Sequence, residues 1–295
     1  MKVAKAAHRA SATTSVSPSD YYYRFRQFCS FYPLRERHLA DSILHAIGKL
    51  PDSKSSSFSI LDVGSADGEL LAELVGLLRA RSDIELHCVA VEPDPVAFAR
   101  LEVTSALLRK QARVIIDCIQ GTIQDVITRK HAIPLVTFDC ILCSHVFYHL
   151  KDWLGVIATF TSLLNREGCV VVILDSFKSP IYQFRESLEI TLGNHGAIQD
   201  YGDLISAEDF LAFLKSSGLS YSHRELDWNL AFTQDHLIAD LEGVLTFLYR
   251  FGVNGRKNVK RAVQKFAKKF SSGQVYVFPW KEALFVVTPH GVSCR

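Results

Sequence analysis

The stretch ILDVGSADGEL, residues 60–70, decides the fold of this chain. An apolar run from Phe58 leads into it, and leucines at helical spacing follow it, at positions 70, 71, 74, 77 and 78. This order predicts a strand, a tight turn and a helix. Because Gly64 and Gly68 carry no Cβ, the turn lets backbone pass close to a nucleotide-like ligand.

The spacing of small residues in the turn distinguishes between kinds of nucleotide-binding loop. A dinucleotide fingerprint needs G-x-G-x-x-G, and Ala66 and Glu69 stand where its second and third glycines belong. The pattern D-x-G-x-G-x-G fits better, with one glycine replaced by alanine. The turn thus resembles motif I of the class I methyltransferases that use S-adenosylmethionine. The resemblance implies a cofactor cradle formed by Asp62, Gly64, Ser65, Ala66 and Gly68.

Composition limits the function classes. At 295 residues with 48% hydrophobic side chains, the chain can bury a large core. A formal charge of +2 gives no global basic field of the kind that attracts nucleic acid. No apolar run approaches the roughly 18 residues of a membrane span. The seven cysteines are odd in number and lack zinc-type pairing, so we expect reduced, buried thiols and a cytoplasmic protein.

Four segments are expected along the chain. Residues 1–19 are rich in Ala, Ser and Thr and carry no acid, which is typical of a disordered leader, with organelle targeting as the alternative. Residues 20–57 are expected to form an N-terminal helical lid, and 58–178 the S-adenosylmethionine-binding core. Residues 179–295 should supply substrate-side helices and the final strands of the same sheet.

Strands and helices alternate through the core, which predicts a parallel sheet with helices on both faces. The expected strands span 58–63, 86–92, 113–119, 138–144, 169–175 and 219–226, with a final pair at 274–279 and 283–288. The expected helices span 67–81, 95–109, 122–130, 150–165, 180–192, 207–217, 234–251 and 257–270. We therefore predict an α/β fold: a doubly wound, mostly parallel seven-stranded sheet (a Rossmann-like methyltransferase fold) with an N-terminal helical lid and a distal helical insertion.

Polar residues at the carboxyl ends of the expected strands complete the cofactor site, because ligands of open α/β sheets bind at that edge. Glu92 can accept hydrogen bonds from both ribose hydroxyls; alternatively it is a helix N-terminal acid ahead of a helix that starts at Pro93. Gln120 and Thr122 are placed to meet the adenine edge, and Thr122 could instead cap the next helix. The Ser144 and His145 backbone is expected beside the sulfonium, and Pro93, next to Glu92, is a further expected cofactor contact.

A longer resemblance, covering nearly the whole chain after the leader, is to the histamine N-methyltransferase group of small-molecule methyltransferases. The similar stretches are YRFRQF (23–28), VEPDP (91–95), FYHLKDW (147–153), YGDLISAEDFLAFLKSSGLSY (201–221) and QVYVFPWKEALFVV (274–287). The resemblance implies that the N-terminal helices close over an aromatic pocket. The expected aromatic substrate contacts are Tyr21, Phe25, Phe28, Tyr148, Tyr182, Phe184, Phe247 and Trp280.

The chain departs from that group at the polar substrate positions. The family's acid in the N-terminal segment falls near Leu34 with Arg35 beside it, its Gln aligns with His145, and its Asn falls near Lys281. Arg35, His145 and Lys281 would suit a carboxylate or neutral acceptor better than a bare ammonium. We expect His145 to contact substrate or accept its proton. The alternatives are a structural histidine and solvated surface charges.

The sequence therefore predicts an enzyme that methylates a nitrogen of a small polar metabolite, with oxygen as second choice. We expect S-adenosylmethionine as cofactor, no metal, no membrane and a monomer. The basic segment RKNVKRAVQKFAKKF, residues 256–270, suggests an RNA or protein methyltransferase as the runner-up, although such a run is more often a solvated helix face. A catalytically inert cofactor-binding scaffold is the alternative of another class; the intact loop and Glu92 argue against it.

Overall fold

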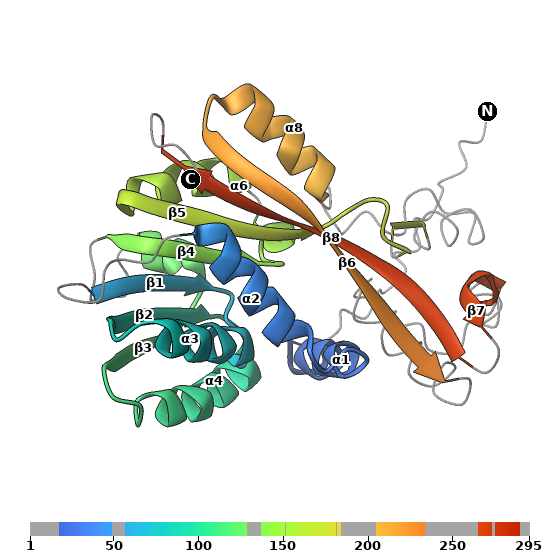
Figure 1. Ribbon diagram of the computed structural model, residues 1–295, viewed down its shortest axis with the longest axis horizontal. Helices are drawn as coiled ribbons and strands as arrows, with labels where there is room; N and C mark the ends of the chain where they lie inside the picture. Colours follow the sequence, from blue (N-terminus) through green and yellow to red (C-terminus); the bar gives the residue numbers. More distant parts are fainter. Residues whose placement is uncertain are drawn as a thin grey trace, which may run out of the picture.

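A seven-stranded sheet with the spatial order β3-β2-β1-β4-β5-β8-β6 forms the body of the computed structural model (Figure 1). The structure describes residues 18–48, 57–128, 137–150, 152–180, 182–183, 205–233, 265–272 and 275–289. The strands are β1 (Ser57–Val63), β2 (Glu85–Glu92), β3 (Val114–Gln120), β4 (Phe138–Ser144), β5 (Leu164–Asp175), β6 (Ser220–Thr233) and β8 (Val275–Thr288), and the two-residue β7 (Ser271–Ser272) pairs with β8. Neighbours among β1 to β5 are parallel, whereas β8 is antiparallel to β5 and β6.

Helices cover both faces of this sheet, which confirms the doubly wound α/β prediction. One face carries α2 (Arg35–Ile47), α3 (Glu69–Arg81) and α4 (Pro95–Leu108), and the other carries α6 (Trp153–Ser162) and α8 (Ala207–Ser217) (Figure 1). The helix α1 (Pro18–Ser30) precedes α2, and α5 (Ile123–Ile127) follows β3. Short 3-10 turns occupy Phe147–His149 (η1) and Lys268–Phe270 (η2).

The apolar runs form strands because both faces of the parallel sheet are buried. In β1, every residue after Ser57 is buried, as expected for a strand between two helical layers. On one face, Leu39 and Ile43 of α2 and Leu71 of α3 join a single core. This packing fixes α2, and with it Arg35 at its start, against the carboxyl-end edge of the sheet.

Several predicted boundaries were wrong, each for a local reason. The helix α3 begins at Glu69 and not at residue 67, because Gly68 is left-handed with φ of 79°. The helix α4 does begin at residue 95 as predicted, because Asp94 caps it by accepting hydrogen bonds from Val96 N and Ala97 N; the alternative start at Pro93 behind Glu92 is wrong. The helices α5 and α6 are shorter than expected, and β5 begins five residues earlier.

The predicted final strand pair is instead one continuous strand, β8, which runs straight through Pro279. The β5 partners of β8 end at Glu282, so the stretch before it has β6 along one side and β7 only near Tyr276. A proline is tolerated there because its missing N–H costs no hydrogen bond on an open strand side. As a result β6 and β8 continue as a two-stranded ribbon past the end of β5 (Figure 1).

Some expectations fall outside the described residues: the leader up to residue 17, the helix at 234–251, and most of those at 180–192 and 257–270. Of the basic segment, residues 265–270 are described; Lys265, Lys268 and Lys269 are exposed and Phe266 is buried, ring against ring with Phe270. In the described part of the chain, no helix is both long and apolar enough to cross a membrane. The six cysteines there are free thiols, five of them buried.

Candidate active site

The glycine loop between β1 and α3 is a backbone cradle at the carboxyl edge of the sheet. Gly64, Ala66 and Gly68 all have positive φ, at 69°, 50° and 79°. The loop closes on itself, since Gly68 N donates to Ser65 O at 2.9 Å, and Gly64 N donates to Val91 O at 2.8 Å. A Cβ on Gly64 would stand 2.5 Å from Val146 Cγ2. This position therefore requires glycine for two reasons, its positive φ and the lack of space for a side chain. The loop thus has the shape expected of motif I.

Glu92 joins the glycine loop to the end of β2. Its Oε2 accepts from Ala66 N and its Oε1 from Asp94 N, both at 2.8 Å. Burial raises the pKa of Glu92, and these two backbone hydrogen bonds act against that rise. An ionised carboxylate has about four acceptor sites, so each oxygen retains one for a ribose hydroxyl. The residues present therefore fit the adenosine end of S-adenosylmethionine.

The adenine-side predictions have a mixed outcome. Gln120 ends β3 beside Glu92 in the strand register, with an exposed side chain. Thr122 caps α5 in a capping box: its hydroxyl donates to Asp125 Oδ2 at 2.7 Å and accepts from Asp125 N. The capping alternative is thus the one the structure shows for the Thr122 side chain. Pro93 is exposed and lies outside α4.

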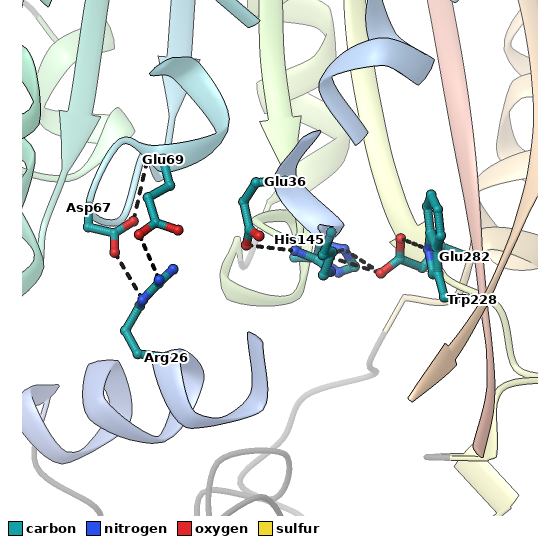
Figure 2. Close-up of polar contacts among 8 residues, drawn as sticks. Arg26, Glu36, Asp67, Glu69, His145, Trp228 and Glu282 are labelled. Atoms are coloured by element: carbon teal, nitrogen blue, oxygen red, sulfur yellow. Dashed lines mark hydrogen bonds and ion pairs between the residues drawn. The ribbon is translucent and has the colours of Figure 1, made fainter. Parts of the chain in front are cut away.

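The lid helix α1 is fastened to the glycine loop by residues that the sequence reading missed. Tyr22 Oη donates to Asp67 Oδ2 at 3.1 Å, and Arg26 contacts Asp67 Oδ2 at 3.1 Å and Glu69 Oε1 at 2.7 Å. Figure 2 shows Arg26 reaching from α1 toward both carboxylates. An acid inside the glycine motif was the available signal, although nothing in sequence identified its partners.

A second polar cluster lies where α2, the loop after β4 and strand β8 meet. Arg35 Nη2 contacts His145 Nε2 at 2.6 Å and donates to Glu282 Oε1 at 3.0 Å. Trp228 Nε1 donates to Glu282 Oε2 at 2.7 Å, and Arg35 Nη1 lies 3.7 Å from Glu36 Oε1. Figure 2 shows Glu282 and Trp228 approaching His145 from one side and Glu36 on the other. The Arg35 charge is therefore neutralised inside the protein.

Asp175 extends this cluster from the end of β5. Trp280 Nε1 donates to Asp175 Oδ1 at 2.8 Å, and Asp175 N donates to Tyr148 Oη at 2.5 Å. Asp175 Oδ2 lies 3.8 Å from His145 Nδ1, too far for a hydrogen bond. Within the described part of the chain, that oxygen has no hydrogen-bond donor. The side chain of Asp175 is 12% exposed, and that of the neighbouring His145 is 20% exposed.

Burial and neighbouring charges separate the two buried carboxylates. For Glu282, burial alone would raise the pKa, yet the Arg35 guanidinium holds it well below its usual range. Burial raises the pKa of Asp175, and the Glu282 charge adds to the rise. Burial and the Asp175 charge also raise the pKa of Tyr148 far above its usual range. Asp175 is thus the carboxylate more readily protonated.

The composition of this cluster is also that of a metal site, because ligand atoms of His145, Asp175 and Glu282 lie within 4.8 Å of one another. Arg35 Nη2 already contacts two of those ligand atoms, His145 Nε2 and Glu282 Oε1. A guanidinium therefore occupies the position that a cation would take.

The predicted aromatic contacts are only partly brought together. The Phe28 ring of α1 packs 5.0 Å from Trp280, and the Tyr148 ring lies 6.0 Å from His145. Tyr182 is close enough to raise the pKa of Tyr148, and Phe25 is half-buried on α1. The side chain of Tyr21, and the residues Phe184 and Phe247, lie outside the description.

Two polar predictions need correction, those for Arg35 and Lys281. Arg35 is 5% exposed and paired with Glu282, so it does not present a free charge to a substrate carboxylate. Lys281 pairs with its cross-strand neighbour Asp227 at 2.8 Å, on the opposite face of β8 from Glu282. Arg35 contacts Nε2 of His145, so Nδ1 is the ring nitrogen left to meet a substrate, and the proton-acceptor role stays a prediction. The predicted substrate contact of His145 stays a prediction, as do the cofactor contacts of the loop, Glu92, Gln120 and Ser144.

Comparisons with known proteins agree with this geometry. A family model described as a methyltransferase domain matches residues 30–223. The YcgJ protein from Bacillus subtilis is similar in structure, with a TM-score of 0.53, 15% identity, and coverage of 86% of this chain and 99% of that one. The BH2331 protein from Bacillus halodurans C-125 has a TM-score of 0.52 and 12% identity, covering 85% and 98%.

The two structural likenesses support the fold alone at these identities, whereas the family model spans well over half of the chain. No curated protein sequence matches the chain, so the narrower resemblance to the histamine N-methyltransferase group stays a prediction. The chain belongs to the methyltransferase domain family, and S-adenosylmethionine is its cofactor.

Proposed function

We propose that this protein methylates a nitrogen of a small polar metabolite, such as an amine, an imidazole or an amino acid-like compound. The observation that carries the proposal is Asp175, a largely buried residue whose Oδ2 has no donor among the described residues. It stands at the carboxyl end of β5, and in the sheet order only β4 separates β5 from the strand that leads into the glycine loop. An N–H of an acceptor molecule would complete it.

The charge around Asp175 favours an amine over an acid. Arg35 is the cation of the cluster, and it faces the two carboxylates Glu36 and Glu282 in addition to the nearby Asp175. A substrate carboxylate placed here would meet further negative charge, which costs binding free energy. The sequence suggested a preference for an anionic substrate. We now expect the opposite, because Arg35 and Lys281, two of the residues on which that expectation rested, are already paired with acids.

The chain's own residues can perform the remaining work. S-adenosylmethionine supplies the methyl group when it is bound. The glycine loop and Glu92 would hold its adenosine, and the indole of Trp280 with the rings of Tyr148 and Phe28 would exclude water from the acceptor. Asp175 Oδ2 would receive the proton that the nitrogen loses, for which a raised pKa is suited. Orientation of a nitrogen lone pair supplies much of the rate in such transfers.

The experiment is a screen of amines, imidazoles, amino acids, phenols, RNA and protein with detection of S-adenosylhomocysteine. We expect turnover with one or more small nitrogen compounds. Asp175→Asn should lower kcat/KM for that acceptor by about 10²-fold or more, because removing a proton acceptor costs that much. The control is Asp227→Asn, which lies on the opposite face of the β6–β8 ribbon and should leave turnover unchanged.

Turnover confined to hydroxyl compounds, RNA or protein would refute nitrogen methylation of a small metabolite. Cofactor binding without turnover on any acceptor would favour the inert scaffold. Equal activity of Asp175→Asn and Asp227→Asn would remove Asp175 from the site even if a nitrogen acceptor were found.

A further inference from the structure

The side chain of Arg35, at the start of α2, reaches into the second polar cluster, where the acceptor site is proposed. It is 5% exposed, and its partners lie 110 and 247 positions further along the chain. Its Nη2 carries two hydrogens and has two neighbours, Glu282 Oε1 at 3.0 Å and His145 Nε2 at 2.6 Å. One hydrogen therefore points to each neighbour.

This arrangement fixes the protonation of the His145 ring. A guanidinium has five N–H donors and no acceptor, so His145 Nε2 has to be the acceptor in the 2.6 Å contact. A hydrogen on Nε2 would set two N–H donors against each other. The contact between Nε2 and Glu282 Oε1 at 3.2 Å is then a proximity and not a hydrogen bond. The ring hydrogen belongs on Nδ1.

The Nδ1 side of the ring faces the acceptor site. Nδ1 lies 3.8 Å from Asp175 Oδ2 and 3.4 Å from Tyr148 Oη. Glu282, by contrast, has a donor on each oxygen, from Arg35 and Trp228, and is closed to a ligand. His145 Nδ1–H, with its long 3.4 Å contact to Tyr148 Oη, and Asp175 Oδ2 are then a donor and an acceptor side by side.

We infer that Arg35 is a positioning residue that holds His145 as the neutral Nδ1–H tautomer, so that His145 donates to the methyl acceptor while Asp175 accepts from it. The tautomer assignment stands on contacts within the protein, and only its consequence for the acceptor rests on the proposed function. It implies a substrate with a hydrogen-bond acceptor atom close to the methylated N–H, as in an amino amide.

Without Arg35, the same surroundings would favour the opposite state. His145 Nε2 would then face Glu282 Oε1, while Nδ1 still faced Asp175 Oδ2. A ring between two carboxylates gains from a hydrogen on Nε2, either as the other neutral tautomer or as the imidazolium. The charged groups that face the ring are Arg35, Glu282 and Asp175, with Tyr148 as the neighbouring phenol.

Nitrogen-15 NMR of the ligand-free, full-length protein tests this directly, with the His145 ring signals assigned by their loss in His145→Gln. The wild-type protein should show a hydrogen on Nδ1 and a bare Nε2 at neutral pH. Arg35→Met should move the hydrogen to Nε2 or protonate both nitrogens. The matched control is Arg37→Met, which removes a surface partner of Glu73 from the same helix and should change neither signal.

A wild-type His145 with a hydrogen on Nε2, as tautomer or imidazolium, would overturn the inference, and this result does not depend on whether Arg35→Met folds. An unchanged ring in a folded Arg35→Met protein would overturn it as well. Once an acceptor is known, Arg35→Met should raise KM for it about tenfold, add an ionisation to the pH profile of kcat/KM, and leave S-adenosylhomocysteine affinity within about twofold. Absence of turnover in every variant would instead count against the proposed function and leave the NMR result standing.

Discussion

Tyr22 on α1 donates its hydroxyl hydrogen to Asp67 inside the glycine loop, across 45 positions of sequence and 3.1 Å of space. The same carboxylate oxygen receives Arg26, so one loop residue holds two points of the lid. Burial raises the pKa of Tyr22, and the neighbouring Asp67 charge adds to that rise, so the phenol remains a donor at all ordinary pH values. These contacts therefore hold helix α1 against the glycine loop.

Replacing Asp67 by alanine should weaken the attachment of α1 to the glycine loop. Tyr22 and Arg26 each lose an acceptor, and the buried phenol is left without one, which costs roughly 1–3 kcal/mol. We expect faster proteolysis within α1 and a lower melting temperature in Asp67→Ala. The control Glu73→Ala removes an exposed partner of Arg37 on α3 and should melt like wild type. Identical proteolysis of the two variants would mean that α1 is held by its apolar contacts alone.

Glu92→Gln should weaken cofactor binding. The glutamine keeps one oxygen for a backbone N–H but turns its amide donors toward the other, so either Ala66 N or Asp94 N loses its acceptor. The substitution disturbs both the loop and the ribose site. We expect a loss of roughly 1.5–3 kcal/mol in the free energy of cofactor binding, or about tenfold or more in affinity. Calorimetry with S-adenosylhomocysteine measures the change. Glu85→Gln, a half-exposed position at the other end of β2, serves as control; equal affinities in the two proteins would exclude the role assigned to Glu92.

The strand-turn-helix around Gly64 was predictable because each of its signals is local. An apolar run, small residues at fixed spacing and leucines at helical spacing all lie within about 25 residues. The carboxyl-edge location of Glu92 followed from the sheet rule alone. The same locality explains the failure at Pro279, where a proline and an exposed turn-like composition hid a strand that is supported by β6.

The second polar cluster could not be predicted from the sequence, because its charged residues pair with residues that lie far away along the chain. Arg35 reads as a solvated base on an amphipathic helix, and only the packing of α2 against the sheet buries it beside Glu282. Lys281, its neighbour in the same prediction, alternates to the other face of β8 and meets Asp227. Arg35 and Lys281 look equivalent in the sequence but lie in different surroundings. Strand alternation turns Lys281 away from the cluster, whereas a contact with Glu282, 247 positions away, holds Arg35 inside it.

Gly64→Ala should destabilise the fold. A left-handed conformation costs an alanine roughly 1–2 kcal/mol, and its Cβ would also stand 2.5 Å from Val146 Cγ2. Adding Val146→Ala removes the clashing methyl group and should recover only the steric part of the loss. Gly76→Ala is the matched control, because nothing lies within 4 Å of its added Cβ and alanine favours the helix α3. Urea denaturation of the four proteins checks the order; a Gly64→Ala protein as stable as wild type would show that the loop adopts another conformation.

Asp62 makes the stability of the protein depend on pH. Burial raises its pKa from 3.8 to about 7, the Glu92 charge adds to the rise, and a hydrogen bond from Ser65 opposes it. Between these two values the folded protein keeps a proton that the unfolded chain has lost. The folded state therefore binds more protons, and its free energy of unfolding decreases as pH rises from about 4 to 7.

Asp62→Asn removes the ionisation, so its advantage over wild type should grow from pH 5 to pH 8. The growth is on the order of 1–3 kcal/mol, since one pKa unit corresponds to about 1.4 kcal/mol. Any cost of placing an amide in the strand is the same at both pH values and cancels in that comparison. Urea denaturation at pH 5, 6, 7 and 8 measures it, with the exposed Asp117→Asn on β3 as control. If Asp62→Asn and Asp117→Asn show the same pH dependence as wild type, the Asp62 carboxyl is ionised in the fold and burial does not govern it.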